Sequence, residues 1–394
     1  MRLLYITNGF PFPLTSGYLR HYHLLRWLAQ HHSITLASIV DGRHERSHRD
    51  AIAGWVQSIH TAAPESGRWG RRLGRLVELA GIRPARSVRQ LRHEIARLVQ
   101  RDPPDAVVFS GKRTVPILDV LDGLPIVADL TDATSERLSG MRESRRGLRR
   151  LQLSAELRQA RDAERRLIER ATRLVFASER DRDALLRDQP QRRAASLVIP
   201  NGVDTDYWHR QRPELGQDCV VFSGVMSYEP NADAALVLIR EVMPSVWTEI
   251  PSATCAIVGR DPGPELYAAA AGHRCTITGS VDDMRPHLEE AAVFAAPLRF
   301  GAGIQNKVLE ALAMEIPAVV SPLAAAGLAK DDRQPPLHVA DGPAATAHQI
   351  VTLLHAGRAD ASPLAEGRAF VEREFSWARS GQALESALRE LAEG

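Results

Sequence analysis

The sequence predicts an α/β protein made of two doubly wound domains, each built on a parallel sheet. Short apolar runs alternate with amphipathic segments along the chain, the alternation starts afresh near residue 196, and 394 residues suit two domains better than one. We place the domains at residues 1–195 and 196–375, and we expect a helix over 376–394 to cross back onto the first domain. Two such domains facing each other would leave a cleft between their strand ends.

Composition excludes several classes of protein. With 44% hydrophobic and 25% charged residues the chain is globular, and a formal net charge of +2 gives no argument for a nucleic-acid partner. No apolar run approaches the roughly 20 residues of a membrane span, and the first residues resemble a strand rather than a signal peptide. Cys219, Cys255 and Cys275 are odd in number and lack metal-ligand spacing, which predicts reduced thiols and a cytoplasmic protein.

The first βαβ unit sets the direction of the first sheet. Leu3–Ile6 is apolar and predicts a strand, Tyr18–Gln30 has helical periodicity, and Ile34–Val40 predicts the next strand. The connecting loop ends at Gly17, where free backbone N–H groups would start the helix. An ordinary connection is the simpler interpretation of this loop.

Residues 65–100 are rich in arginine with interleaved leucines. A basic amphipathic segment could lie on the inner face of an anionic plasma membrane, giving a peripheral contact, or receive an acidic acceptor. The alternative, which we favour, is a solvated helical face in a protein whose basic residues are mostly arginine.

Two further strands of the first half end in polar residues. Ala106–Ser110 and Ile126–Leu130 are short apolar runs, and ligands of open α/β sheets bind beyond the carboxyl ends of the strands. Asp129, Asp132 and Glu136 are therefore candidate site residues, with capping of the next helix as the competing role. A long charged helix over 141–172 and a strand over 174–178 complete this half.

The second half repeats the pattern and ends in a glycine-rich turn. The expected strands are 220–224, 253–259, 275–279, 293–297 and 318–320, and the expected helices are 232–242, 266–271, 284–291 and 377–392. Gly301 and Gly303 precede a helix whose apolar face recurs at helical spacing, and Pro317 ends it. Free N–H groups at such a turn suit a diphosphate.

Lys307 and Glu310 lie about one turn into that helix. A cation for phosphate and a carboxylate for sugar hydroxyls are what a nucleotide-sugar site needs. Lys307 is one of three lysines, with Lys112 and Lys330, among 50 Lys and Arg residues. A solvated helix lysine is the alternative interpretation.

Several segments resemble retaining, family-4-type glycosyltransferases with the GT-B fold, closest to the branch associated with PEP-CTERM/exosortase exopolysaccharide systems. They are IPNGVD, SGVMSYEPNADA, NGFPFPLTSGYLRHYHLLRWLA, DLTDATSER and, most specifically, GIQNKVLEALAM. The resemblance covers nearly the whole chain. It implies a hexosyltransferase that uses a nucleotide diphosphate sugar, with UDP or GDP as nucleotide and no metal or other cofactor.

The resemblance also implies site residues. Glu310 matches the family glutamate that holds the ribose, and Lys307, Asp132 and Glu310 are the expected catalytic residues. The expected donor contacts are Gly17, Gly224, Arg299, Gly301, Gly303, Ile304, Gln305, Asn306, Lys307 and Glu310. The expected acceptor contacts, for a saccharide, lipid-linked or small-molecule acceptor, are Tyr18, Arg20, Asp129, Asp132 and Glu136.

The chain departs from the family pattern at several positions. Ala302 replaces the glutamate that usually contacts the donor sugar, and Thr131 falls where a histidine is usual. The Arg and Lys that usually follow the first strand of the second domain are missing, so we infer that Lys307 and Arg299 supply that charge. Glu315 takes the place of a helix-ending glycine.

Four functions remain open at this point. The leading hypothesis is hexosyl transfer in surface or exopolysaccharide assembly, with domain closure excluding water from the donor. Transfer to a natural product or other small molecule is the main rival, because Tyr18 and Leu19 make the acceptor side more apolar. A sugar-nucleotide epimerase or a non-catalytic GT-B partner subunit are alternatives of another class.

Overall fold

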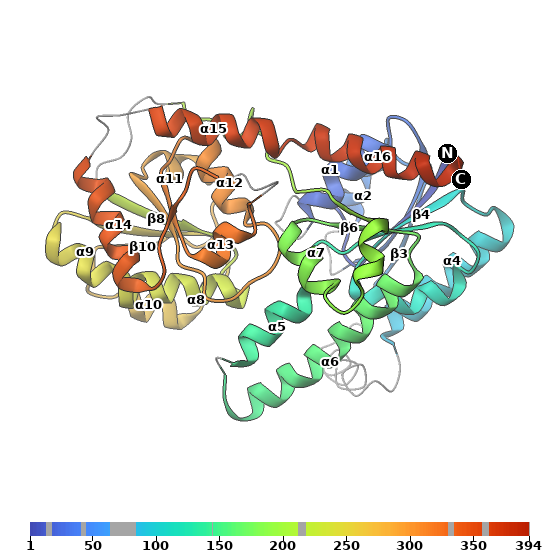
Figure 1. Ribbon diagram of the computed structural model, residues 1–394, viewed down its shortest axis with the longest axis horizontal. Helices are drawn as coiled ribbons and strands as arrows, with labels where there is room; N and C mark the ends of the chain where they lie inside the picture. The colour runs from blue at the N-terminus through green and yellow to red at the C-terminus, as the bar shows by residue number, and fades with distance from the viewer. Residues whose placement is uncertain are drawn as a thin grey trace. The chain divides into compact units, whose positions relative to one another are not determined.

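The chain forms two compact units in the computed structural model, which describes residues 1–12, 18–40, 45–63, 84–143, 145–211, 218–329, 335–356 and 362–393 (Figure 1). Unit 1 comprises Met1–Gly202 and Trp377–Gly394, and unit 2 comprises Val203–Ser376. The first unit extends beyond residue 195 because strand β7 (Ser196–Val198) pairs with β6 (Arg173–Phe176) and completes its sheet. The cleft between facing domains stays a prediction.

Unit 1 is built on a seven-stranded sheet in the order β3-β2-β1-β4-β5-β6-β7, in which every neighbouring pair is parallel. Its other strands are β1 (Arg2–Thr7), β2 (Ser33–Ile39), β3 (Ser58–Ala62), β4 (Ala106–Ser110) and β5 (Ile126–Asp129). The sequence analysis did not predict β3. Its residues are mostly half-buried, as is typical of a strand at a sheet edge.

Helices cover both faces of this sheet, and the alternation of side chains along β1 explains why. Leu4 and Ile6 belong to a core shared with α4, a 3-10 helix and α6, whereas Leu3 and Tyr5 belong to a core shared with α1, α2 and α16. The bounds are α1 (Leu19–Leu28), α2 (Glu45–Ala53), α4 (Arg86–Arg101), the 3-10 helix Lys112–Val120, α5 (Thr134–Glu143), α6 (Gly147–Arg170), α7 (Glu179–Leu185), the 3-10 helix Pro190–Ala195 and α16 (Trp377–Glu393).

The C-terminal helix α16 packs on α1 within unit 1, as Figure 1 shows. Trp27 donates from Nε1 to Glu385 over 3.1 Å, and a Cβ on Gly381 would meet the Trp27 ring at 2.3 Å. At the start of the helix the Trp377 ring stacks on His23 with a centroid separation of 4.4 Å. Gly202 lies against the backbone of Trp377, where a Cβ would approach the amide nitrogen to 2.3 Å.

Unit 2 is a second Rossmann-like unit on a six-stranded parallel sheet in the order β10-β9-β8-β11-β12-β13. Its strands are β8 (Cys219–Ser223), β9 (Thr254–Val258), β10 (Cys275–Ile277), β11 (Val293–Ala296), β12 (Ala318–Val320) and β13 (His338–Val339). Its helices are α8 (Glu229–Val237), a π-helical turn (Leu238–Val242), α9 (Met243–Glu249), α10 (Pro264–Ala270), α11 (Arg285–Glu289), α12 (Asn306–Ala313), α13 (Pro322–Ala326), α14 (Pro343–Ala356) and α15 (Ser362–Glu374). The predicted strand–helix alternation is confirmed, and with it the α/β class.

Helix α12 ends at Ala313, and Glu315 follows its C-cap Met314 at the position where the family resemblance pointed to a glycine. Glu315 has a φ of 55°, in the left-handed region that glycine adopts more readily. Its N–H donates to Leu312 O over 3.0 Å and the N–H of Ile316 donates to Ala311 O over 3.0 Å. These are the two hydrogen bonds of a Schellman motif, so a side chain occupies a position that the motif reserves for glycine.

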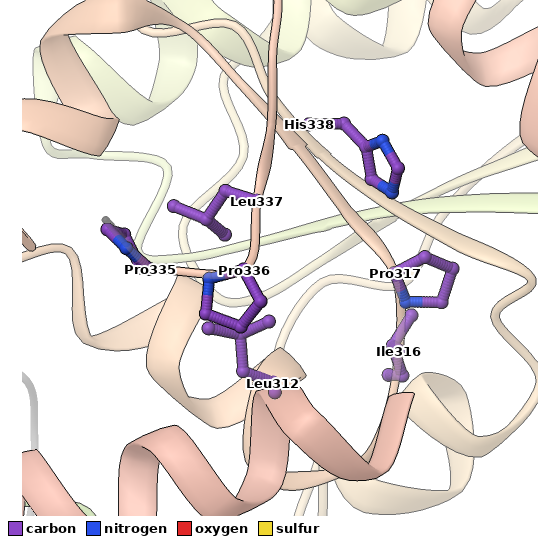
Figure 2. Close-up of a pocket in the computed structure, with 8 residues that line it drawn as sticks. Leu312, Ile316, Pro317, Pro335, Pro336, Leu337 and His338 are labelled. Atoms are coloured by element: carbon purple, nitrogen blue, oxygen red, sulfur yellow. The ribbon is translucent and has the colours of Figure 1, made fainter. Parts of the chain in front are cut away.

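A small cavity of about 240 Å³ lies at this C-terminal end of α12 (Figure 2). It is lined by Leu312, Ile316, Pro317, Pro335, Pro336, Leu337, His338 and Gly367. Burial lowers the pKa of His338, so the imidazole is neutral near pH 7. The sequence analysis assigned no role to this region.

Two predictions on helices need correction or restriction. The helix expected over 141–172 is split into α5 and α6, and Gly147 begins the second with a φ of 60°. Of the basic segment 65–100, residues 64–83 lie outside the described residues. The described part, α4, packs Val88, Leu91 and Ile95 into the core, which supports a solvated arginine face.

Among the described helices, none combines the length and the apolar character that crossing a membrane requires.

Candidate active site

The candidate site of unit 2 lies where the strand order of the sheet reverses. Strand β8 has β9 on one side and β11 on the other, so the chain leaves β8 and β11 in opposite directions. In an open parallel sheet this switch point leaves a crevice at the carboxyl ends of the strands. The loop after β8 begins at Gly224, and the loop after β11 runs from Pro297 to Gln305.

The glycine-rich loop after β11 delivers the chain into α12. Gly303 has a φ of 73°, which favours glycine, whereas Gly301 has no such requirement, because a Cβ there would make only ordinary contacts at 3.7 Å and beyond. Gln305 is the N-cap of α12 and makes no side-chain capping bond. At this helix start the N–H of Asn306 donates to Ile304 O over 3.2 Å and that of Val308 donates to Gln305 O over 2.9 Å. The positive end of the helix dipole lies there and favours an anion.

Lys307 connects the two helices that follow these loops, α12 and α8. Its Nζ donates to Asn231 Oδ1 over 2.5 Å and to Gln305 Oε1 over 3.4 Å, and it lies 5.3 Å from the centroid of the Phe222 ring. The side chain is half-buried, and burial lowers its pKa to about 8, while the nearby Glu310 acts in the opposite direction. A partly desolvated ammonium group is a strong partner for a phosphate, because little water competes with the ligand.

Glu310 lies one turn further along α12 and is also half-buried. Burial raises the pKa of its carboxyl to about 7, although the charge of Lys307 lowers it. Lys307 and Glu310 therefore form a cation and a carboxylate on one face of the helix, as the sequence predicted. A half-buried carboxyl group whose pKa is raised by its surroundings is typical of residues that bind a ligand or take part in catalysis.

Asn231 is a site residue that the sequence analysis missed. It lies on α8, is 5% exposed, and donates from Nδ2 to Val225 O over 3.0 Å while its Oδ1 accepts from Lys307. Gly224 has a φ of 156°, and a Cβ there would meet Asn231 Nδ2 at 2.6 Å. Gly224 therefore makes room for the amide that fixes Lys307.

Arg299 is held by acidic side chains. Its guanidinium forms a two-pronged pair with Asp233, Nε donating to Oδ2 over 2.9 Å, and a further contact of 3.7 Å with Glu241. Asp233 is 6% exposed. This pairing offsets the charge of Arg299, so of the two cations proposed to replace the missing Arg and Lys, Lys307 is the better placed.

The pKa of Tyr207 is raised by burial, then by Asp283 and, to a smaller extent, by the nearby carboxylate of Glu310. Its hydroxyl donates to Asp283 Oδ1 over 3.3 Å, and the Arg285 guanidinium lies 4.1 Å from its ring centroid. The sequence analysis did not single out Tyr207, because an aromatic residue in a loop carries no pattern.

In unit 1, Arg20 and Asp129 form a buried ion pair. Arg20 Nε donates to Asp129 Oδ2 over 2.8 Å, and the two side chains are 4% and 1% exposed. Arg20 Nη1 also donates to Ile199 O over 2.8 Å and to Asn201 Oδ1 over 3.0 Å. Both residues were expected to bind the acceptor. In the structure the contacts of Arg20 hold the segment that follows β7, and the acceptor role of both residues stays a prediction.

The polar cluster around this pair continues to His21 and Ser110. The His21 ring lies 3.4 Å from the Tyr5 hydroxyl and 3.3 Å from Ser110 Oγ. Burial lowers the pKa of His21 to about 4, so the ring is neutral near pH 7. This histidine therefore serves the packing of α1 on the sheet and does not bring a positive charge.

Asp132 is half-exposed and tied to Lys112. Lys112 Nζ donates to Asp132 Oδ1 and to Thr134 Oγ1, each over 2.8 Å, and lies 3.4 Å from Glu164. Burial raises the pKa of Asp132, but the charges of Lys112 and Arg137 outweigh it and the net pKa is lowered. An ionised carboxylate of low pKa suits binding better than proton uptake.

The other expected acceptor residues have different surroundings. Glu136 is exposed in the first turn of α5. Tyr18 precedes α1, and its ring covers Gly9, where a Cβ would meet the ring at 2.1 Å. Gly17 lies outside the described residues. Within the described ranges, no three His, Cys, Asp or Glu side chains come close enough to hold a metal ion.

Comparison with solved structures supports the fold class. HepE from Anabaena, solved with UDP and glucose, has a TM-score of 0.71 at 13% identity, with 99% of this chain and 100% of that chain covered. Sucrose-phosphate synthase from Thermosynechococcus elongatus has a TM-score of 0.71 at 13% identity, with 99% of each chain covered. The UDP-forming α,α-trehalose-phosphate synthase from Burkholderia vietnamiensis has a TM-score of 0.64 at 11% identity, with 99% and 100% covered.

These similarities show the GT-B fold. Residues 217–356, which include the whole switch-point site of unit 2, match the family model described as glycosyl transferases group 1. This domain and the similar structures indicate a transferase enzyme. No curated protein matches the chain.

Proposed function

We propose that the chain is a retaining hexosyltransferase that moves a hexose from a UDP- or GDP-sugar to a hydroxyl acceptor. The observation that carries the proposal is the bridge from Lys307 to Asn231, which joins α12 and α8, the helices that follow the loops after β11 and β8 at the switch point of unit 2. It holds a half-buried cation at the start of α12, near the positive end of the helix dipole. The UDP and glucose bound to HepE support a nucleotide-sugar donor.

Each residue of the site has a role in this proposal. The N–H groups from Gly303 to Asn306 and the ammonium group of Lys307 bind the diphosphate, and Glu310 accepts hydrogen bonds from the ribose hydroxyls. In the transfer, the bond between the hexose C1 and the diphosphate oxygen breaks, the acceptor oxygen bonds to C1, and the proton of the acceptor hydroxyl passes to the departing diphosphate. The leaving oxygen takes the electron pair, so preorganised donors at the diphosphate stabilise the transition state. The reaction needs no metal ion in this scheme.

We place the acceptor on unit 1, near the carboxyl ends of its strands. Asp132 and Glu136 supply carboxylates for hydroxyl groups, and Tyr18 supplies an aromatic face. The family resemblance supports a saccharide or lipid-linked acceptor in surface polysaccharide assembly. The Tyr18 ring gives the rival, a small-molecule acceptor, a physical basis, because sugars and apolar aglycones both stack on aromatic rings.

A panel of nucleotide sugars scored by thermal shift tests the donor. A ligand that binds only the folded state raises the melting temperature. At a hundredfold excess over its Kd, it adds about 2.7 kcal/mol to the free energy of unfolding. We expect a UDP- or GDP-hexose to shift the transition and the free hexose to leave it unchanged. Product analysis by NMR then reports the anomeric configuration, and an inverted product would exclude the retaining mechanism.

A non-catalytic partner subunit is the second candidate function. It is motivated by Ala302 in place of a donor-binding glutamate and by Arg299, whose charge is offset by Asp233. Such a subunit would show no shift with any UDP-, GDP- or dTDP-sugar. A donor that binds but is neither hydrolysed nor transferred to a panel of acceptors would also favour it.

A further inference from the structure

Helices α5 and α6 form a hairpin that projects from the sheet of unit 1 (Figure 1). We call the described residues 141–143 and 145–152 the hairpin tip. Leu148 and Leu151 lie there, one turn apart near the start of α6, and they are 80% and 68% exposed. They are the two most exposed large hydrophobic side chains of the described residues. The opposite side of α6 buries Leu153 and Leu157, so the helix is anchored while the two leucines face outward.

The hairpin tip is also strongly basic. It contains five arginines, Arg142, Arg145, Arg146, Arg149 and Arg150, against one acid, Glu143. Arg146 and Arg150 are exposed. Further along α6 the charges are mixed, as in the contacts of Arg165 with Asp162 and of Arg166 with Asp119. The excess of positive charge is therefore concentrated where the leucines are exposed.

We propose that the hairpin tip binds the surface of an anionic lipid bilayer. The two leucines enter the boundary between headgroups and acyl chains, and the arginines meet the lipid phosphates. Exposed apolar side chains within a basic patch match this two-layered partner, because one part of it is apolar and the adjacent part is negatively charged. The long arginine side chains can keep their guanidinium groups at the headgroups while their methylene stems lie along the leucines.

This surface differs from the basic segment 65–100, of which the described part packs its apolar side chains into the core. The charge of the hairpin tip favours an acidic partner, and two isolated leucines suit shallow insertion better than a shaped protein pocket. The inference does not rest on the proposed transferase activity. A chain that binds no nucleotide sugar would still bind vesicles through the hairpin tip.

Co-sedimentation of the full chain with vesicles tests the inference. We expect binding to vesicles of equal phosphatidylcholine and phosphatidylglycerol, and little binding to phosphatidylcholine alone. Arg146→Gln with Arg150→Gln should lower the partition coefficient about 25-fold at low salt, about fivefold for each charge. Leu148→Gln with Leu151→Gln should lower it about tenfold, an effect that persists at high salt.

Matched variants on the same helix serve as controls. Arg158 and Arg161 are exposed about two turns further along α6, and Arg158→Gln with Arg161→Gln should leave binding within about twofold of the parent chain. The melting temperature checks that every variant folds. The inference is overturned if the chain binds neutral and anionic vesicles equally or binds neither. It is equally overturned if both control and tip variants lose binding alike, or if the tip variants change self-association and leave vesicle binding intact.

Discussion

Replacing Glu310 with glutamine separates the contribution of this carboxylate to binding from its effect on stability. Glutamine keeps the shape of the side chain and removes its charge. Burial raises the pKa of Glu310 from 4.5 to about 7 in the folded chain, against the opposing effect of Lys307. The ionised side chain therefore destabilises unit 2 at neutral pH, and the variant should relieve this cost.

The size of the stability effect and the pH range in which it occurs follow from the raised pKa of Glu310. At 1.36 kcal/mol per unit the rise corresponds to at most about 3 kcal/mol, and partial exposure reduces our expectation to about 1–2 kcal/mol. Because the folded-state pKa lies above the unfolded-state value, the folded chain holds the extra proton between pH 4.5 and about 7. The parent chain loses stability as the pH rises through this window, whereas the Glu310→Gln chain does not.

Thermal unfolding of both chains from pH 4.5 to 8 measures the effect, with Glu249→Gln, at an exposed position of α9, as the control. We expect equal melting temperatures near pH 4.5 and a higher one for Glu310→Gln at pH 8. Binding should change in the opposite direction, because a lost hydrogen bond to a charged group costs about 1.5–3 kcal/mol and weakens affinity for the nucleoside diphosphate tenfold or more. A variant that is no more stable at pH 8, or that binds as tightly as the parent, refutes the reasoning.

Three other substitutions test separate parts of the account. Lys307→Ala should slow transfer by about 2–4 kcal/mol at saturating donor, and unchanged turnover would remove Lys307 from the mechanism. Glu315→Gly should stabilise the chain by about 1 kcal/mol, because glycine adopts the left-handed φ without strain; a lower melting temperature would contradict this. Arg20→Leu leaves Asp129 buried without its partner and should destabilise unit 1 by about 3–5 kcal/mol in denaturant unfolding. Its control is Arg2→Ala, which removes an exposed ion pair and should cost less than about 1 kcal/mol. Equal effects of the two arginine substitutions would count against the buried pair.

The fold could be predicted because its signals are local. Apolar runs of strand length alternate with helical periodicity, and the turn at Gly303 and the helix end at Glu315 are fixed by residues within a few positions of each other. The edge strand β3 was missed, because its sequence SIHTA is short and half-polar. Where the signal is a periodic pattern within one element, the sequence was sufficient.

The surroundings of the site residues could not be predicted, because they depend on contacts between distant segments. Lys307 and Asn231 are 76 positions apart, and Arg20 and Asp129 are 109 positions apart. The sequence placed Arg20 near a helix start and Asp129 at a strand end, at the edge of the sheet where ligands bind. It could not reveal that the two residues neutralise each other there. It likewise marked Arg299 as a spare cation, although Asp233 pairs with it. The residue types indicated a charged site, and only the packing showed which charges are already satisfied.

The central claim is that Lys307, fixed by Asn231, binds the diphosphate of a nucleotide sugar in unit 2. Calorimetric titration of the full chain with UDP- and GDP-hexoses, repeated with Lys307→Ala and with Glu249→Gln, tests it most directly. The account predicts a donor with a Kd of about 1 mM or tighter, weakened at least about tenfold by Lys307→Ala and unchanged by Glu249→Gln. Absence of binding to every donor, or equal binding by the parent and the Lys307→Ala chain, would contradict it.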